Sequence, residues 1–102
     1  SAVSIWVMGT HLAAFAENLN TLSTARRQPL SHAEVARRLT ALGVPTSAAW
    51  VQLAREGRQA NPSAARVQAL AKVFGVPIGY FFDPDVTDLV NAALEKARAG
   101  LG

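Results

Sequence analysis

The sequence predicts an all-α protein with about six helices and no sheet. Alanine and leucine, both strong helix formers, make up 20 and 11 of its 102 residues. No segment shows the strict alternation of apolar and polar residues that is typical of a half-buried strand. Glycine and proline instead divide the chain into pieces of one to four helical turns, at Pro29, Gly43, Gly57, Gly75 and Gly100.

The first two helices are predicted from apolar spacing and from their ends. The first covers about residues 11–27, with Arg26 and Arg27 in its last turn, where cations interact favourably with the helix dipole. The second begins after Ser31, which forms a capping box with Glu34. Gly43 follows this second helix as its C′ residue.

The next two helices are short. The third starts after Thr46 or Ser47, since either side chain can cap it, and stops at Gly57. For the fourth, Asn61 is predicted as N-cap with Pro62 at the first helical position. It should close at Gly75.

A short fifth helix is expected over residues 77–82, and Asp83 followed by Pro84 opens the sixth. The sixth helix carries an apolar stripe at mixed spacings of three and four. This stripe either packs on its own domain or pairs with a second copy, and we expect pairing through Val86, Leu89, Val90, Ala93, Leu94 and Ala97.

Composition excludes several classes of protein. Without cysteine there is no disulfide scaffold, thiolate zinc site or Cys nucleophile. His11 and His32 have no partners at metal-ligand spacing, so neither a metal nor a cofactor is expected, and the chain is not expected to be an enzyme. No apolar run approaches the roughly 20 residues of a membrane span. We expect a cytoplasmic protein.

The charge is unevenly distributed, which indicates a polyanionic partner. The net charge is only +3, but residues 1–75 hold eight basic and three acidic residues, whereas residues 76–102 hold two basic and four acidic ones.

The second and third predicted helices flank the turn over residues 43–46, which is the layout of a helix-turn-helix. In that motif the second helix enters the major groove of DNA, so the recognition helix here is about residues 47–56.

Four segments follow one another along the chain: Leu30-Ser31-His32-Ala33-Glu34-Val35-Ala36, Glu56-Gly57-Arg58, Asn61-Pro62-Ser63 and Leu70-Ala71-Lys72-Val73-Phe74-Gly75-Val76-Pro77. In this order they resemble the XRE or phage-repressor-type helix-turn-helix family, and the longer link over residues 40–46 resembles its actinobacterial branch. The resemblance covers about residues 12–83 and implies a five-helix DNA-binding domain, commonly a homodimer with an added C-terminal helix. We therefore expect a flexible leader over residues 1–10, unless Trp6 packs into a groove, then a DNA-binding domain over 11–83 and a dimerisation helix over 84–102.

Base contacts are expected from the outer face of the recognition helix. Gln52 can bond adenine bidentately, Ala48 or Ala49 can touch a thymine methyl, and Ser47 lies at the helix start. Leu53 departs from the family pattern, in which this position is normally exposed. Either the helix is slightly rotated, or Leu53 makes an apolar contact in the groove.

Phosphate contacts are expected on both sides of that helix. Basic residues flank it, and the resemblance implies a polar phosphate contact at His32 and an aromatic one at Trp50, although Trp50 can also pack between helices and Asn61 can simply cap its helix. Arg66 and Lys72 are expected to face solvent. The predicted phosphate-contacting set is His32, Arg37, Arg38, Trp50, Arg55, Arg58 and Asn61.

These predictions lead to one function and one alternative. The predicted function is a sequence-preferring, double-stranded DNA-binding transcriptional regulator that acts as a homodimer. The alternative is a protein-interaction or antitoxin-type module that uses the helix-turn-helix as a scaffold, which the alanine-rich recognition face and Leu53 leave open.

Overall fold

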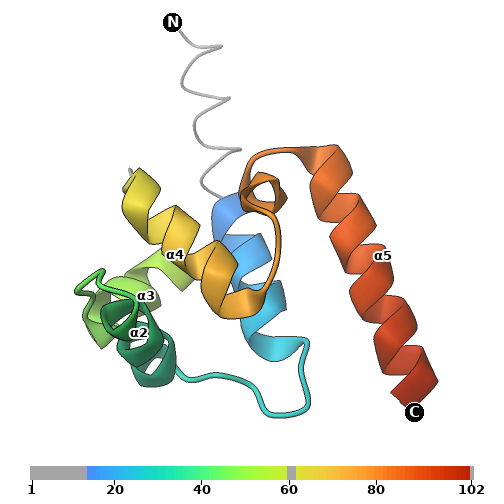
Figure 1. Cartoon of the computed structure of the whole chain (residues 1–102), viewed down its shortest axis with the longest axis horizontal. Coiled ribbons are helices and arrows are strands. Elements are labelled where there is room, and N and C mark those ends of the chain that lie inside the picture. The colour runs from blue at the N-terminus through green and yellow to red at the C-terminus, as the bar shows by residue number, and fades with distance from the viewer. Residues whose placement is uncertain (1–13, 60–61, 102) are drawn as a thin grey trace, which may run out of the picture.

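Every regular element in the described part of the chain is a helix, which confirms the all-α class (Figure 1). The structure is a computed structural model that describes residues 14–59 and 62–101. The predicted leader therefore lies outside the described residues. A helix over residues 14–24 is followed by α2 (His32–Ala41), α3 (Ala48–Arg55), α4 (Ala64–Phe74), the 3-10 helix η1 (Ile78–Phe81) and α5 (Pro84–Leu101).

Several predicted helix ends are confirmed. Ser47, rather than Thr46, caps α3, because its hydroxyl accepts a hydrogen bond from the Trp50 amide. Gly43 after α2 has a φ of 87°, and Gly75 at the end of α4 has a φ of 67°. Both lie in the left-handed region that glycine adopts without steric cost, which explains why these helices end there.

Two predicted ends are wrong. Asn61 does not cap α4, because α4 starts at Ala64 and the hydroxyl of Ser63 accepts from the Arg66 amide. Ser63 is thus the N-cap, and Pro62 lies outside the helix. The first helix ends at residue 24, so Arg26 and Arg27 lie in a bend over residues 25–28 and not in a last helical turn.

The early end of the first helix has a structural reason. The backbone amide of Leu30 donates to the carbonyl of Ser23 at 3.0 Å, which folds the chain back onto the helix. This turn places the Leu30 side chain in the core, where it is buried. The Ser23 hydroxyl is also buried and donates to the carbonyl of Leu19. Burial of the Leu30 side chain therefore stabilises the fold more than another turn of the first helix would.

One hydrophobic core joins the first helix, α2, α3, α4 and η1. The Phe15 and Phe81 rings lie 5.4 Å apart, and Tyr80 meets Phe81 edge to face. Each fully buried aliphatic side chain contributes roughly 1.5–3 kcal/mol. The fully buried large side chains are Leu19, Val35, Leu39, Val51, Val67, Leu70 and Tyr80.

Tyr80 connects η1 to two other helices. Its carbonyl accepts hydrogen bonds from Asn18 of the first helix, at 3.1 Å, and from the Thr87 hydroxyl of α5, at 2.6 Å. Its own hydroxyl donates to Asn91 Oδ1 at 2.7 Å. Burial of the ring raises the pKa of Tyr80. These bonds hold α5 along one side of the molecule, apart from the α2–α4 cluster (Figure 1).

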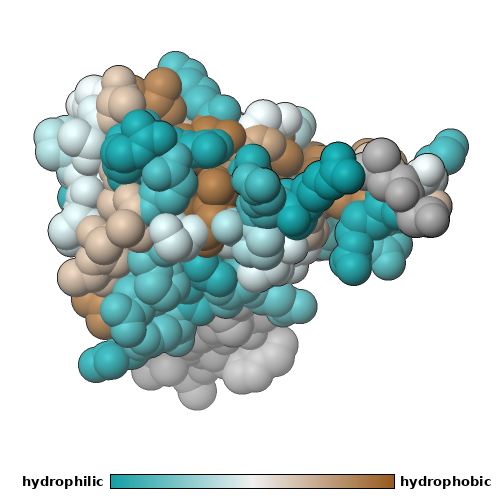
Figure 2. All heavy atoms as spheres, turned by 90° about the horizontal axis from the view of Figure 1, so that it is seen from below, coloured by the Kyte–Doolittle hydropathy of each residue, from teal (hydrophilic) through white to brown (hydrophobic). Residues whose placement is uncertain are grey.

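The surface seen from below is largely hydrophilic, with hydrophobic residues in smaller patches, and the end of α5 projects from the body (Figure 2). Among the described residues the exposed large hydrophobic side chains are Leu42, Ile78, Phe82 and Leu89. No helix in the described part of the chain combines the length and the apolar character that a membrane crossing requires.

Candidate nucleic-acid interface

The first turns of α3 present small and polar side chains to solvent. Ala48, Ala49 and Gln52 are exposed, while Val51 and Ala54 on the opposite face are fully buried in the core. The helix is therefore oriented with Ala48, Ala49 and Gln52, three of the predicted base-contacting residues, outward.

Leu53 is partly buried on the side of α3. Because Val51 and Ala54 already occupy the core, no rotation of the helix is needed to accommodate Leu53. Its partly exposed side chain adds an apolar surface beside Gln52.

A network of hydrogen bonds fixes the turn that precedes α3. The Thr46 amide donates to the Thr40 hydroxyl at 3.2 Å, and the Thr46 hydroxyl donates to the carbonyl of Val44 at 2.9 Å. The Val44 amide in turn donates to the carbonyl of Leu39 at the end of α2. Ser47, the N-cap of α3, follows Thr46 directly. The hydrogen bonds between this turn and α2 therefore fix the position at which α3 starts.

Arg66 corrects a prediction, because its side chain is directed to the turn before α3 and is only partly exposed. It is partly buried, and its guanidinium donates to the Thr46 hydroxyl at 3.4 Å and to the carbonyl of Pro45 at 3.3 Å. The same group lies over the Trp50 ring, 4.8 Å from its centroid. Lys72, at the other end of α4, is exposed as predicted.

Trp50 both packs and remains partly accessible. It lies in the first turn of α3, it is partly buried, and it contacts the core. Packing of Trp50 against the core is therefore shown, and a phosphate contact of its exposed part stays a prediction.

On α2, Glu34 neutralises part of the predicted basic face. Its carboxylate accepts from Arg37 at 2.6 Å and from Arg38 at 3.0 Å. These hydrogen bonds, that of Arg37 first, lower the pKa of Glu34 from 4.5 to about 2, and the carboxylate raises the pKa of Arg37. Only the Ser31 half of the predicted capping box is present, in which the Ser31 hydroxyl accepts from the Glu34 amide.

Arg55 is bound within the fold. Its Nε donates to Asn20 Oδ1 at 2.6 Å, and one terminal nitrogen donates to the carbonyl of Leu30 at 3.4 Å. The same nitrogen lies 3.5 Å from His32 Nδ1, so Arg55 and His32 are neighbours beside the N-terminus of α2. Arg55 therefore joins α3 to the first helix, whatever contact it makes with DNA.

Arg58 and Gln52 share an acidic neighbour that the sequence analysis overlooked. Glu56 lies 3.7 Å from Arg58 through one carboxylate oxygen and accepts from Gln52 at 3.3 Å through the other. All three side chains are exposed, so these contacts are weak and easily exchanged. Asn61, the remaining predicted phosphate contact, lies outside the described residues.

The predicted dimerisation stripe on α5 is divided between two directions. Val86, Val90 and Leu94 are partly buried and pack against the core of the same chain. Leu89 is 72% exposed, and Ala93 and Ala97 are also exposed. Half of the stripe thus packs within the chain, and the other half is exposed to solvent.

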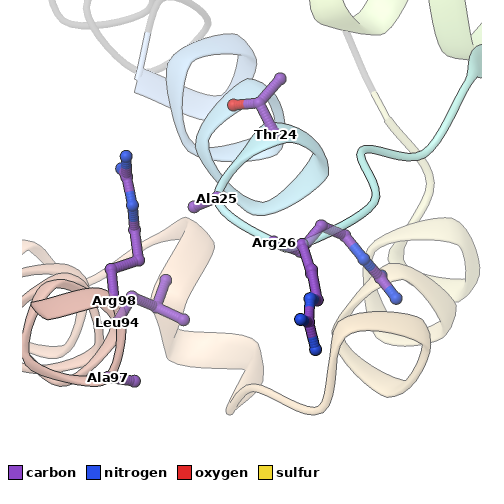
Figure 3. A pocket seen from close by; sticks show the side chains of 7 residues that line it. Thr24, Ala25, Arg26, Leu94, Ala97 and Arg98 are labelled. Atoms are coloured by element: carbon purple, nitrogen blue, oxygen red, sulfur yellow. The ribbon is translucent and has the colours of Figure 1, made fainter. Parts of the chain in front are cut away.

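A groove separates the second half of α5 from the end of the first helix (Figure 3). It has a volume of about 410 Å³, with Ala25, Leu94 and Ala97 as apolar lining and the arginines of residues 26, 27 and 98 around it. This groove lies on the α5 side of the molecule, whereas most of the predicted DNA contacts belong to α2 and α3.

Arg66, Glu56 and Asn20 were not recognised as parts of the site from the sequence. Arg66 lies 20 and 21 residues from its partners in the turn, and Asn20 lies 35 residues from Arg55. No local pattern reports contacts at such separations. Glu56 alone had a local signal, since it is four residues from Gln52 and can share a helix face with it. In the described ranges, no three His, Asp or Glu side chains are grouped as a metal site would require.

Comparison with known proteins connects this arrangement to one group of relatives. No family model matches the chain. The nucleoid-associated protein EspR of Mycobacterium tuberculosis, from strains CDC 1551 / Oshkosh and ATCC 25618 / H37Rv, is 34% identical over 85 residues. The match covers 79% of this chain and 64% of each relative, so the chain spans less than two thirds of their length. Over most of its length, the chain is thus similar to a nucleoid-associated protein.

Proposed function

We propose that this protein is a double-stranded DNA-binding transcriptional regulator of the XRE helix-turn-helix type, with α3 as its recognition helix. The observation that carries the proposal is the orientation of α3. Its N-terminal face is exposed and lined by Ala48, Ala49 and Gln52, while Val51 and Ala54 anchor the opposite face in the core.

The shape of this face suits the major groove. The groove is about 12 Å wide and admits an α-helix. Two alanines at the start of α3 allow the backbone to approach the base edges closely, and a methyl group can contact thymine. Gln52, one turn further along the helix, offers both an amide donor and an acceptor for adenine.

Phosphate contacts are proposed on either side of the groove. On one side are the free backbone amides at the start of α2, with His32, Arg37 and Arg38. On the other side are Arg58 and Asn61, after the end of α3. Similarity to a protein named as nucleoid-associated supports the same class of partner here, and with it a cytoplasmic location at the nucleoid.

A homodimer through α5 is part of the proposal. Leu89 is exposed although it is a large apolar residue, and Ala93 lies four residues further along the same helix. Pairing of these faces would bring two recognition helices to one operator with two half-sites. The domain boundaries proposed for the chain remain 11–83 for DNA binding and 84–102 for pairing.

The protein-interaction alternative also has a specific observation in its favour. Leu42 is 49% exposed at the end of α2, and Leu53 is partly exposed on α3. Apolar side chains on this side would suit a protein partner better than a phosphate backbone.

Binding of DNA fragments followed across a range of salt concentrations decides between the two functions. The fluorescence anisotropy of a labelled duplex measures the binding constant. Its logarithm should fall linearly with the logarithm of the salt concentration, because phosphate contacts release counterions. Selection from random-sequence duplexes should then yield a preferred site with two half-sites. An interaction module would show no DNA binding even at low salt, and that result would refute the proposal.

A further inference from the structure

Arg66 on α4 forms hydrogen bonds to the turn in front of the recognition helix. Its Nε donates to the Thr46 hydroxyl at 3.4 Å, and a terminal nitrogen donates to the carbonyl of Pro45 at 3.3 Å. Both partners lie within the link between α2 and α3. Arg66 thus connects the start of α4 with the two residues that immediately precede the N-cap Ser47.

The same guanidinium also holds the first turn of α3. Its central carbon lies 4.8 Å from the centroid of the Trp50 ring, within the roughly 6 Å range of a cation–π contact. Three contacts from one planar group suit arginine, because the guanidinium offers several donors in a fixed plane as well as a face that stacks on aromatic rings. A lysine ammonium is a point charge and cannot keep all three contacts.

The turn is thereby bonded from two directions. From α2, the Thr40 hydroxyl accepts from the Thr46 amide at 3.2 Å, while it donates to the Ala36 carbonyl of its own helix at 2.9 Å. From α4, Arg66 reaches the Thr46 side chain. A recognition site must be held within about 0.5 Å of its productive geometry, and such supporting bonds provide that precision.

We infer that Arg66 is a positioning residue for base recognition. It fixes the start of α3 and the Trp50 ring, and it neither reads a base nor supplies a phosphate contact. This inference rests on the proposed function, since it assigns a role within the same interface. Arg66 should therefore affect the discrimination between DNA sequences, whereas Arg58 should affect binding to all sequences alike.

Three variants test this role: Arg66→Ala, Arg66→Lys and, as a matched control, Lys72→Ala. Lys72 is exposed on the same helix, so its removal deletes one positive charge without touching the turn. The probes are a duplex selected by the parent protein from random DNA and a scrambled duplex of equal length, each titrated across salt.

We expect Arg66→Ala to lower the affinity ratio between the selected and the scrambled duplex about tenfold, the equivalent of one lost directed contact, with an unchanged salt slope. Arg66→Lys should have an affinity ratio between those of the parent and Arg66→Ala, although it keeps the charge. Lys72→Ala should have the same affinity ratio as the parent. An unchanged ratio in Arg66→Ala, or a salt slope reduced by about 1 with the ratio retained, would overturn the inference.

A second measurement needs no DNA. In a Trp6→Phe background Trp50 is the sole tryptophan. Acrylamide should quench its fluorescence more strongly in Arg66→Ala and Arg66→Lys than in the parent or in Lys72→Ala. Equal quenching in all four proteins would refute the positioning role. Failure of the parent to bind any duplex would instead refute the proposed function, and the quenching result would still decide the contact. If Arg66→Ala does not fold, Arg66→Lys carries both measurements.

Discussion

Asn20 and Arg55 bond to each other in both directions. The Asn20 side-chain amide donates to the Arg55 carbonyl at 2.8 Å, and the Arg55 guanidinium donates to Asn20 Oδ1 at 2.6 Å. This reciprocal pair joins the first helix to the last turn of α3. The proposed recognition helix α3 is therefore anchored at its C-terminal end by Asn20 and at its N-terminal end by the turn around Thr46.

Removing the Arg55 side chain should destabilise the fold. Arg55→Ala leaves the part-buried oxygens of Asn20 and Leu30 without their donor, which costs about 1–3 kcal/mol. Urea unfolding of the variant measures this loss. A double-mutant cycle with Asn20→Ala should reveal a coupling energy above about 0.5 kcal/mol. Full stability with reduced DNA affinity would instead assign Arg55 to phosphate binding.

Gln52 should govern the choice of sequence. Gln52→Ala removes the proposed bidentate contact to a base edge, so discrimination at one base pair should fall by about 1–3 kcal/mol while the salt slope is retained. Affinities for the selected duplex and its single-base variants measure this effect. Gln68→Ala, on the exposed face of α4, is a suitable control. A uniform loss over all duplexes would contradict a base-reading role for Gln52.

Arg58 and its neighbour Glu56 should have opposite effects on DNA affinity. Arg58→Ala should weaken binding to every sequence and lower the salt slope by about 1, because one phosphate contact is lost. Glu56→Gln should strengthen binding to all duplexes, since it removes a negative charge that contacts both Arg58 and Gln52. Binding isotherms at several salt concentrations test both. Weaker binding by Glu56→Gln would show that Glu56 instead orients its neighbours.

The ion pairs of Glu34 predict how stability depends on pH. Hydrogen bonds from Arg37 and Arg38 lower the pKa of Glu34 from 4.5 to about 2 in the folded state. Their stabilising effect is therefore complete above the unfolded pKa and is lost as pH falls from 4.5 towards about 2. The urea midpoint of unfolding should be measured for the parent and for Glu34→Gln at pH 6, 3.5 and 2. The difference between the two midpoints should decrease as the pH falls. A constant difference across this range would disprove the linkage.

Two adjacent residues on α5 separate pairing from folding. Leu89→Glu places a charge on an exposed apolar site, so it should convert the proposed dimer to a monomer without loss of stability. Val90→Ala removes methyl groups that pack on the core, so it should cost about 1 kcal/mol and leave the dimer intact. Light scattering and urea unfolding distinguish these effects. A parent protein that is monomeric at micromolar concentration would eliminate the dimer.

The elements of this fold are predictable because their signals are local. Ser47 and Gly75 mark helix ends by their own chemistry, and both predictions are confirmed. Asn61-Pro62 carries an equally strong local signal, yet Ser63 caps α4, since several cap-forming residues stand close together and only packing selects one. Local signals therefore locate a helix end to within a few residues.

The candidate site is less predictable, because arginine side chains reach partners far away in the sequence. Arg66 was expected to face solvent, but it binds the turn before α3. The bond of Arg55 to Asn20 was not predicted, and the phosphate contact of Arg55 stays a prediction. A long cationic side chain has the same local pattern in either role. Only the fold determines whether a protein oxygen or an aromatic ring lies within its reach.

The buried Tyr80 has a consequence for operator architecture. Its hydrogen bonds to Thr87 and Asn91 attach the first half of α5 to η1, and its bond to Asn18 attaches η1 to the first helix. In a homodimer that pairs through α5, this attachment would fix the distance between the two α3 helices, and therefore the spacing of the two half-sites. An extra base pair between half-sites would have to be accommodated by twisting or bending the DNA, at an energetic cost that depends on the sequence of the spacer.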